Sequence, residues 1–223
     1  MNKWKYYFAC IGVMCVMLLG IYWGNQAVSV LSESLSGKER HCILIDPGHG
    51  GEDGGASSCT GRLESGYNLE ISLRLEDLLH LLGYDTKLIR REDVSVYTTG
   101  RTIAQKKVSD LKERVKTANE TNNGILLSIH QNYYPDARYS GAQVFYGNAE
   151  GSEALAKQLQ ASFVAGLNPG SRRQAKQGKG IYLLEHIRCP GVLVECGFLS
   201  NPQEEALLRE PSYQKKLCCV IAT

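Results

Sequence analysis

The sequence predicts an α/β fold: a single domain with a largely parallel sheet of about six strands flanked by helices, preceded by an N-terminal transmembrane or signal segment. Three observations support this prediction. Short apolar runs alternate with helical segments of ten or more residues, as in parallel sheets covered on both faces. The 223 residues, 43% of them hydrophobic and 22% charged, suffice for one domain with a sizeable core. A long uncharged run stands apart at the N-terminus.

The N-terminal segment has two lysines followed by "YYFACIGVMCVMLLGIYW", residues 6–23, which carries no charge. This run is just long enough to span the hydrocarbon core of a bilayer. Small residues at 27–29 also fit a signal peptidase, so cleavage is an alternative to the retained anchor that we favour. We divide the chain into an anchor or signal segment (1–24), a polar linker (25–40) and a domain (41–223). The positive N-terminal end predicts that the domain is exported, either on the outer face of a membrane or secreted.

The first elements of the domain are a strand, a helix and a strand. "CILID", residues 42–46, is an apolar run typical of a buried strand. Residues 63–83 have leucines at helical spacing and end in a glycine, which is a common helix stop. "YDTKLIR", residues 84–90, is the second strand.

The rest of the domain continues this alternation. Helices are predicted over residues 103–120 and 152–167, strands over 124–130, 141–147, 180–184 and 191–197, and a last helical region opens with "NPQEEALLRE", residues 201–210. Six strands result, and their order in the sheet does not follow from the sequence.

A glycine-rich loop with one histidine, "DPGHGGEDGGA", follows the first strand. In open α/β sheets, functional groups gather at the carboxyl ends of the strands. The first, third and sixth strands lead into His49, His130 and Glu195, and the loop delivers Glu64 to the start of a helix. Because glycines let a loop bend closely over the sheet, we expect two imidazoles and two carboxylates at one edge.

Each of these four residues also has a structural interpretation. His49 alone fits a loop histidine bonded to backbone, and Glu64 alone complements a helix dipole. His130 faces a polar loop, and Glu195 needs a partner because burial of a bare carboxylate is costly. A phosphate site is disfavoured because no Gly-Lys-Ser/Thr follows the glycines. Two histidines with one glutamate are a recurrent ligand set for catalytic zinc, which would explain the residues together.

Composition disfavours several classes of protein. The formal net charge of +2 provides no basic stripe, so we predict no nucleic-acid binding. The eight cysteines include no Cys-x-x-Cys pair and no framework spacing, which disfavours a thiolate zinc site and a disulfide scaffold. Cys196 lies in an apolar run and is expected in the core.

Five stretches occur in a characteristic order: "LIDPGHGGEDGGA", Glu64 fifteen residues after His49, "LLSIHQNYYPD", "SGAQVFYG" and "VLVECGFLSNPQEEALL". Together they resemble the zinc-dependent N-acetylmuramoyl-L-alanine amidase family. The short N-terminal segment, "LKERVKTANE" and "GIYLLEHIRCPG" are similar to its germination-specific members from spore-forming bacteria. The resemblance covers almost the whole exported domain, and it is specific because several separate motifs occur in the right order.

The resemblance implies a role for each of the four residues. His49, Glu64 and His130 would bind one Zn²⁺ per chain, and Glu195 would be the catalytic glutamate. The bulky tyrosines of "SIHQNYYPD" depart from the family pattern, so the substrate groove is expected to differ in shape while the metal site is not.

Four further polar residues lie near these positions. Asp46 and Asn132 are candidates for orienting an imidazole or the water, although Asp46 fits a structural role in the tight turn equally well. Arg91 and Arg114 are candidates for contacting peptide carboxylates, with a solvated charge as the favoured alternative for both.

The implied reaction is hydrolysis of the amide between N-acetylmuramic acid and the L-alanine of the stem peptide in peptidoglycan. Zinc would acidify its water and polarise the carbonyl, and Glu195 would transfer the proton. The germination-specific resemblance implies the forespore and its cortex, where this step precedes muramic lactam formation by a separate muramic acid deacetylase. The sequence contains no cell-wall-binding repeat, so an accessory protein that helps to load zinc or substrate is a further candidate partner.

Two other functions stay open as alternatives. In a cysteine amidase, Cys196 would be the nucleophile and His130 its base. Against this, Cys196 alternates away from Glu195 along the strand, so the two side chains are not expected to share a pocket. A catalytically silent, anchored peptidoglycan-binding module predicts loss of a ligand or of the glutamate, and none is lost.

Overall fold

The computed structural model describes Trp4 and residues 41–223. The predicted anchor or signal segment (1–24, apart from Trp4) and the linker (25–40) lie outside the described residues, so both stay predictions. Within the part of the chain that is described, no helix combines the length and the apolar character needed to cross a membrane.

A six-stranded sheet forms the centre of the domain, in the order β2-β1-β3-β6-β4-β5. The strands are β1 (Cys42–Pro47), β2 (Asp85–Leu88), β3 (Gly124–Asn132), β4 (Gln143–Tyr146), β5 (Lys176–Gln177) and β6 (Gly191–Phe198). Neighbouring strands are parallel except β4 and β6, which are antiparallel. The predicted α/β class with a largely parallel sheet is therefore confirmed, and β1, β3 and β6 lie side by side.

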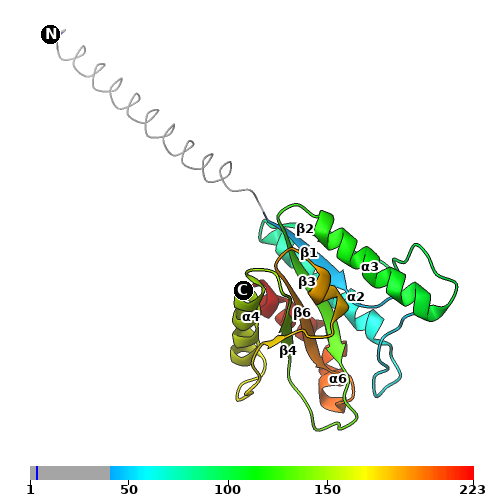
Figure 1. Ribbon diagram of the computed structural model, residues 1–223. Coiled ribbons are helices and arrows are strands. Elements are labelled where there is room, and N and C mark those ends of the chain that lie inside the picture. The colour runs from blue at the N-terminus through cyan, green and yellow to red at the C-terminus, as the bar shows by residue number, and fades with distance from the viewer. Residues whose placement is uncertain (1–3, 5–40) are drawn as a thin grey trace. The chain divides into compact units, whose positions relative to one another are not determined.

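Helices cover both faces of this sheet (Figure 1). They are α2 (Glu64–Leu81), α3 (Ile103–Glu120), α4 (Ser152–Gly166), α5 (Tyr182–His186), α6 (Pro202–Arg209) and α7 (Pro211–Ala222). Successive strand residues alternate between the faces, so that Ile43 and Ile45 pack with α2, α4, α6 and α7. Leu44, Leu126 and Leu193 pack on the other face with α3 and α5.

Helix α3 begins and ends where the sequence predicts. Its N-terminus carries a capping box, in which the Thr102 hydroxyl accepts from the Gln105 backbone N–H and the Gln105 side chain accepts from the Thr102 N–H. These bonds satisfy two donors that the first turn leaves without helical partners. Arg114 and Ala118 lie on the buried side of this helix, which places a cation beneath the loop after β1.

The strand predicted over residues 180–184 is wrong. These residues form a turn and the start of α5, whose backbone hydrogen bonds join residues four apart at 3.1 Å. Leu183 and Leu184 both pack into the same apolar cluster, which a helical turn allows and the alternation of a strand does not. Short apolar runs do not distinguish a strand from a buried helix. The fifth strand is instead the two-residue β5.

Candidate metal and catalytic site

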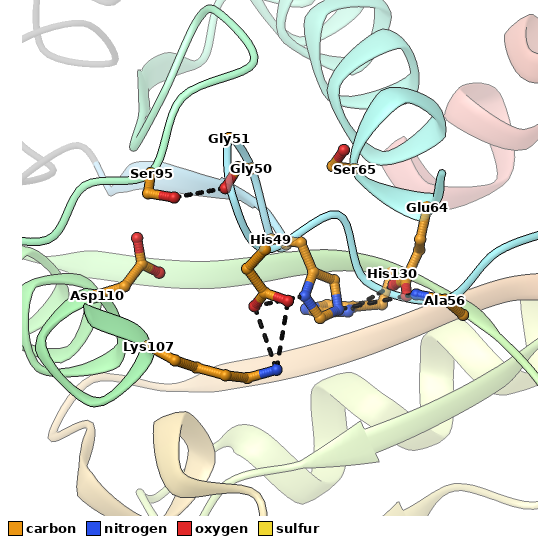
Figure 2. A network of polar contacts seen from close by, with 12 residues as sticks. His49, Gly50, Gly51, Ala56, Glu64, Ser65, Ser95, Lys107, Asp110 and His130 are labelled. Carbon is orange, nitrogen blue, oxygen red and sulfur yellow. Dashed lines mark hydrogen bonds and ion pairs between the residues drawn. The ribbon is translucent and has the colours of Figure 1, made fainter. Parts of the chain in front are cut away.

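Three side chains converge at the carboxyl edge of the sheet (Figure 2). His49 lies in the loop after β1, Glu64 opens α2, and His130 lies near the end of β3. Glu64 Oε2 lies 3.3 Å from His49 Nε2, and Glu64 Oε1 lies 2.9 Å from His130 Nδ1. Each of the three residues offers one ligand atom, and these three atoms all lie within 4.8 Å of one another. Two nitrogens and a carboxylate oxygen are a donor set that zinc favours.

Glycines of the loop make room for these ligands. A Cβ at Gly48 would lie 2.1 Å from Nε2 of His130, and a Cβ at Gly55 would lie 2.6 Å from Oε2 of Glu64. His49 itself has φ 60°, in the left-handed region that glycine favours, although it carries a side chain. Glycine is therefore required at these loop positions because the His130 imidazole and the Glu64 carboxylate occupy the space that a side chain would need.

Two buried arginines hold the backbone of this loop. Arg90 donates from Nε to the carbonyl of Pro47 (2.9 Å) and from Nη2 to that of Gly48 (3.0 Å). Arg114 donates to the carbonyls of Pro47 (3.0 Å) and His49 (2.8 Å). Both guanidinium groups are almost fully buried, with exposed fractions of 3% and 2%. The sequence interpretation placed Arg114 at the surface or against a peptide, and neither place is correct.

Asp46 is the counter-ion of Arg114. It accepts from Arg114 Nη1 and from the Ser128 hydroxyl (2.6 Å), while Asp110 accepts from Arg114 Nε at 2.5 Å. Burial alone would raise the pKa of Asp46, but the Arg114 charge and the Ser128 hydrogen bond lower it. Its carboxylate makes no hydrogen bond to an imidazole within the described chain. It acts on His49 through Arg114, which corresponds to the structural role in the turn.

Asn132 and Arg91 lie away from the ligand group. Asn132 is half-buried at the end of β3, where its backbone carbonyl accepts from the Leu199 N–H at 2.8 Å. No hydrogen bond joins its side chain to an imidazole in the described residues. Arg91 is a largely exposed side chain that donates to Glu76 at 2.5 Å. The structure therefore gives neither residue a contact with the ligands.

Asp53 and Lys107 are neighbours of His49 that the sequence interpretation missed. Asp53 Oδ2 lies 2.9 Å from His49 Nδ1 and 3.2 Å from Nζ of Lys107. Figure 2 shows Lys107 on one side of His49 and Glu64 with His130 on the other. The spacing of four residues between His49 and Asp53 was the available signal, since a ligating imidazole commonly donates its second N–H to a carboxylate.

Hydrogen bonding controls the protonation of the ligand group. Burial by itself would lower the pKa of His49, but hydrogen bonds to Asp53 and Glu64 outweigh it and raise the pKa to about 9. Burial would raise the pKa of Glu64, and the two imidazoles instead hold it far below its usual range. Without a metal, the imidazolium of His49 therefore neutralises the carboxylates. A metal ion bound at this place would take over that role and displace the proton.

Glu195 lies beside the ligand group without joining it. It is paired in register with His130 across the parallel strands β6 and β3, so both side chains lie on the same face of the sheet. Its Oε2 is buried and has no hydrogen-bond partner among the described residues. Burial raises the pKa of Glu195 to about 7. A carboxyl group with a pKa near neutrality is suited to taking up and returning a proton.

Cys196 points away from this site. Its side chain is 2% exposed and belongs to the apolar cluster under α2, α4, α6 and α7, on the face opposite to Glu195. Burial raises the pKa of its thiol well above the usual value. A buried, protonated thiol on the wrong face of the sheet is a poor nucleophile, so the geometry argues against a cysteine amidase.

A cavity of about 110 Å³ opens beside the ligand group. Its lining includes His49 and His130, together with Lys107 from α3 and Tyr182 and Leu183 from α5. The segment predicted as a strand over residues 180–184 thus contributes to the lining of the site.

Comparisons with known proteins agree with this geometry. The family profile described as N-acetylmuramoyl-L-alanine amidase matches residues 43–223. The germination-specific N-acetylmuramoyl-L-alanine amidase of Bacillus subtilis (strain 168) is 37% identical over an alignment of 225 residues, gaps included, which covers 99% of this chain and 92% of that protein.

Solved structures are similar over the same domain. The CwlD amidase from Clostridioides difficile, solved in complex with the GerS lipoprotein, has a TM-score of 0.78 and 35% identity, covering 82% of this chain and 94% of that chain. An N-acetylmuramoyl-L-alanine amidase from Clostridium difficile 630 has a TM-score of 0.71 and 29% identity, covering 82% and 94%.

Proposed function

This chain belongs to the N-acetylmuramoyl-L-alanine amidase family, and we propose that it cleaves its substrate with one zinc ion held by His49, Glu64 and His130 and with Glu195 as the catalytic residue. As a peptidoglycan amidase it hydrolyses the bond between N-acetylmuramic acid and L-alanine. The observation that carries the proposal is the convergence of the three donor groups beside a buried, unpartnered carboxyl oxygen.

The donor set fits zinc in number and chemistry. Catalytic zinc sites use three protein ligands of this kind and leave a further position for water or substrate. When bound, zinc supplies a Lewis acid that polarises the scissile carbonyl and makes water acidic enough to attack near neutral pH. Asp53 holds His49 through Nδ1, which leaves Nε2 facing Glu64 and the metal position.

In the proposed mechanism, Glu195 transfers the proton from the attacking water to the leaving amine. Because its pKa lies near 7, the carboxyl group is partly ionised at neutral pH, and the ionised form can accept a proton from the attacking water. The same group, now protonated, can return the proton to the leaving amine of L-alanine. The products are a free lactyl carboxylate on the sugar and a stem peptide with a free amino terminus.

The similarity to a germination-specific amidase supports a role in the spore cortex. We place the enzyme at the outer face of a membrane around the forespore through residues 1–24, or in secreted form if that segment is cleaved. Removal of the stem peptide would precede the action of a muramic acid deacetylase in lactam formation. Because a similar amidase was solved with a lipoprotein, an accessory protein is a candidate partner of this chain as well.

Two substitutions in the full-length protein test the mechanism. His130→Ala should lower zinc content and stem-peptide release together, because one of three ligands is lost. Glu195→Gln should keep zinc bound while turnover falls by a factor of about 10² to 10⁴. Both quantities are measured on the same preparation, by metal analysis and by release of free stem peptide from peptidoglycan.

Cys196→Ser is the control for this experiment. It should keep zinc and most of the activity, since the thiol lies in the core. If Cys196→Ser abolishes turnover while chelators have no effect, the zinc mechanism is wrong. If the parent protein binds peptidoglycan and releases no peptide, the binding-module alternative replaces it.

A further inference from the structure

An aromatic cluster of Tyr134, Tyr139 and Phe198 lies at the end of strands β3 and β6. The rings of Tyr134 and Tyr139 meet edge to face with centroids 4.6 Å apart, and those of Tyr139 and Phe198 lie 6.3 Å apart. Phe198 is buried, whereas each of the two tyrosines is 48% exposed. Neighbouring Tyr133 is 51% exposed. The two tyrosine rings are therefore exposed to solvent, and the buried Phe198 ring supports them from below.

Polar contacts fix the loop that carries these tyrosines. Asn201, which caps helix α6, donates to the backbone carbonyls of Ala137 (2.9 Å) and Tyr139 (3.3 Å). Arg173 lies over the Phe198 ring at 5.0 Å and donates to the carbonyl of Ser140 at 3.1 Å. Exposed aromatic side chains held in a fixed loop form a surface prepared for a ligand.

The aromatic cluster is continuous with the proposed catalytic site. In the pairing of β3 with β6, His130 stands opposite Glu195, and Asn132 stands opposite Phe198. The two strands that position His130 and Glu195 thus run directly into the cluster. A substrate whose scissile bond lies at His130 and Glu195 extends over the tyrosines if it continues along these strands.

The charge of this surface favours an uncharged ligand. Asp136 and Arg138, the charged pair of the loop, neutralise each other in an ion pair of 2.7 Å. The Arg173 guanidinium over the Phe198 ring donates to the Ser140 carbonyl and to the Gln143 side chain and interacts with the Glu204 carboxylate. The exposed tyrosine rings are thus the uncharged part of this surface, and they match the C–H faces of sugars.

We propose that the aromatic cluster, together with Tyr133, binds the glycan strand of peptidoglycan; this inference rests on the proposed function. The amide to be cleaved is attached through a lactyl group to a pyranose ring, so sugar rings lie close to the reacting bond. The C–H faces of pyranoses pack on aromatic rings, and tyrosine hydroxyls exchange hydrogen bonds with sugar hydroxyl and acetamido groups. The aromatic cluster binds the glycan strand, whereas His130 and Glu195 act on the amide bond that is cleaved.

Binding is measured with the full-length parent protein, using peptide-free glycan strands and free stem peptide as separate probes, because neither probe contains the amide bond to be cleaved. The Tyr134→Ala substitution should weaken binding of the glycan strands by roughly five- to tenfold, as expected for loss of one stacking ring. Tyr134→Phe should retain most of the affinity because the ring remains. In the active enzyme, Tyr134→Ala should raise KM for peptidoglycan more than it lowers kcat.

Tyr84→Ala is the matched control, because Tyr84 is equally exposed (48%) but lies just before β2 at the opposite edge of the sheet. It should bind glycan strands like the parent, and zinc content should be the same in all variants. Unchanged glycan affinity in Tyr134→Ala, or a loss seen only with free stem peptide, would overturn the proposal. If the parent protein, with Glu195 intact, releases no stem peptide from peptidoglycan while its glycan binding still depends on Tyr134, the aromatic cluster stands and the proposed function fails.

Discussion

At the scale of single residues, two buried guanidinium groups are the feature that links fold and site. Arg90 and Arg114 bind the carbonyls of the loop that carries His49, and Asp46 compensates the charge of Arg114. Sequence reasoning found the four residues of the proposed mechanism because they stand at strand ends and at a helix start. The sequence named Arg114 only as a solvated charge or a contact for a peptide and did not single out Arg90, because charged side chains are usually solvated and only the packing of the fold shows that these two are buried.

Replacing Arg114 with lysine tests this link. Lysine keeps the charge but lacks the planar fork that reaches Asp46, Asp110 and two carbonyls at once. We expect zinc affinity to fall roughly 10- to 100-fold, the usual effect of losing a group that orients a ligand. The free energy of unfolding should fall by about 1–3 kcal/mol because buried acceptors lose their donors.

Chelator competition and urea unfolding provide the two readouts. The control is Arg172→Lys, at an exposed arginine, which should change neither quantity. If Arg114→Lys binds zinc as tightly as the parent does, the guanidinium stabilises the fold but does not orient the zinc ligands.

At the scale of elements, most helices and strands are where the sequence places them, including the four-residue strands β2 and β4, whereas α5 and β5 are not. Helix α3 matches its predicted bounds because a capping signal and a continuous helical pattern coincide. The stretch over residues 180–184 misleads because five residues show no periodicity, and tertiary packing decides their conformation. The two residues of β5 carry no pattern of their own and follow from pairing with β4.

The contribution of the Thr102 cap of α3 to the free energy of unfolding should be measurable separately from the rest of the helix. Thr102→Ala removes the hydroxyl that accepts from the Gln105 N–H, so the free energy of unfolding should fall by about 1 kcal/mol. Thr117→Ala in the last turn of the same helix is the control, and it should be neutral or slightly stabilising because alanine has the higher helix propensity. Equal losses in both variants, measured by urea unfolding, would assign the effect to side-chain packing instead of the cap.

At the scale of the whole molecule, the sheet order brings distant parts of the chain to one edge. Strands β1, β3 and β6 are neighbours, and they deliver His49, His130 and Glu195 in spatial order. The sequence predicted the common edge from the rule for parallel sheets, but it could not predict the strand order. That order depends on which faces of the helices fit together.

Charges buried at this edge make the stability of the metal-free protein depend on pH. The pKa of His49 rises from 6.5 to about 9 on folding, so its contribution is complete below pH 6.5 and is lost as pH rises towards 9, by up to about 3 kcal/mol. The pKa values of Asp46 and Glu64 are lowered, so their contributions are present above about pH 4.5 and are lost in acid. Burial raises the pKa of Glu195 from 4.5 to about 7, so ionisation of this carboxyl group costs stability as pH rises through that range. Stability should therefore be greatest near about pH 4.5 and should fall on either side.

Zinc should remove the alkaline part of this profile, because the metal requires a neutral imidazole in the folded state. Urea unfolding over a pH series, with chelator and with zinc, measures both profiles. An alkaline decline of the same size in both would mean that the proton on His49 does not compete with the metal.

The neighbouring placement of β1, β3 and β6 also has a consequence for the order of events during folding. The ligands come from segments far apart in the chain, and strands paired over such distances close late and slowly. A chain that has formed its helices without this central pairing would have no site for the proposed ion. We therefore expect zinc to bind after the rate-limiting collapse, so that added zinc slows unfolding without accelerating folding. Zinc uptake would then report the moment at which the three strands have come together.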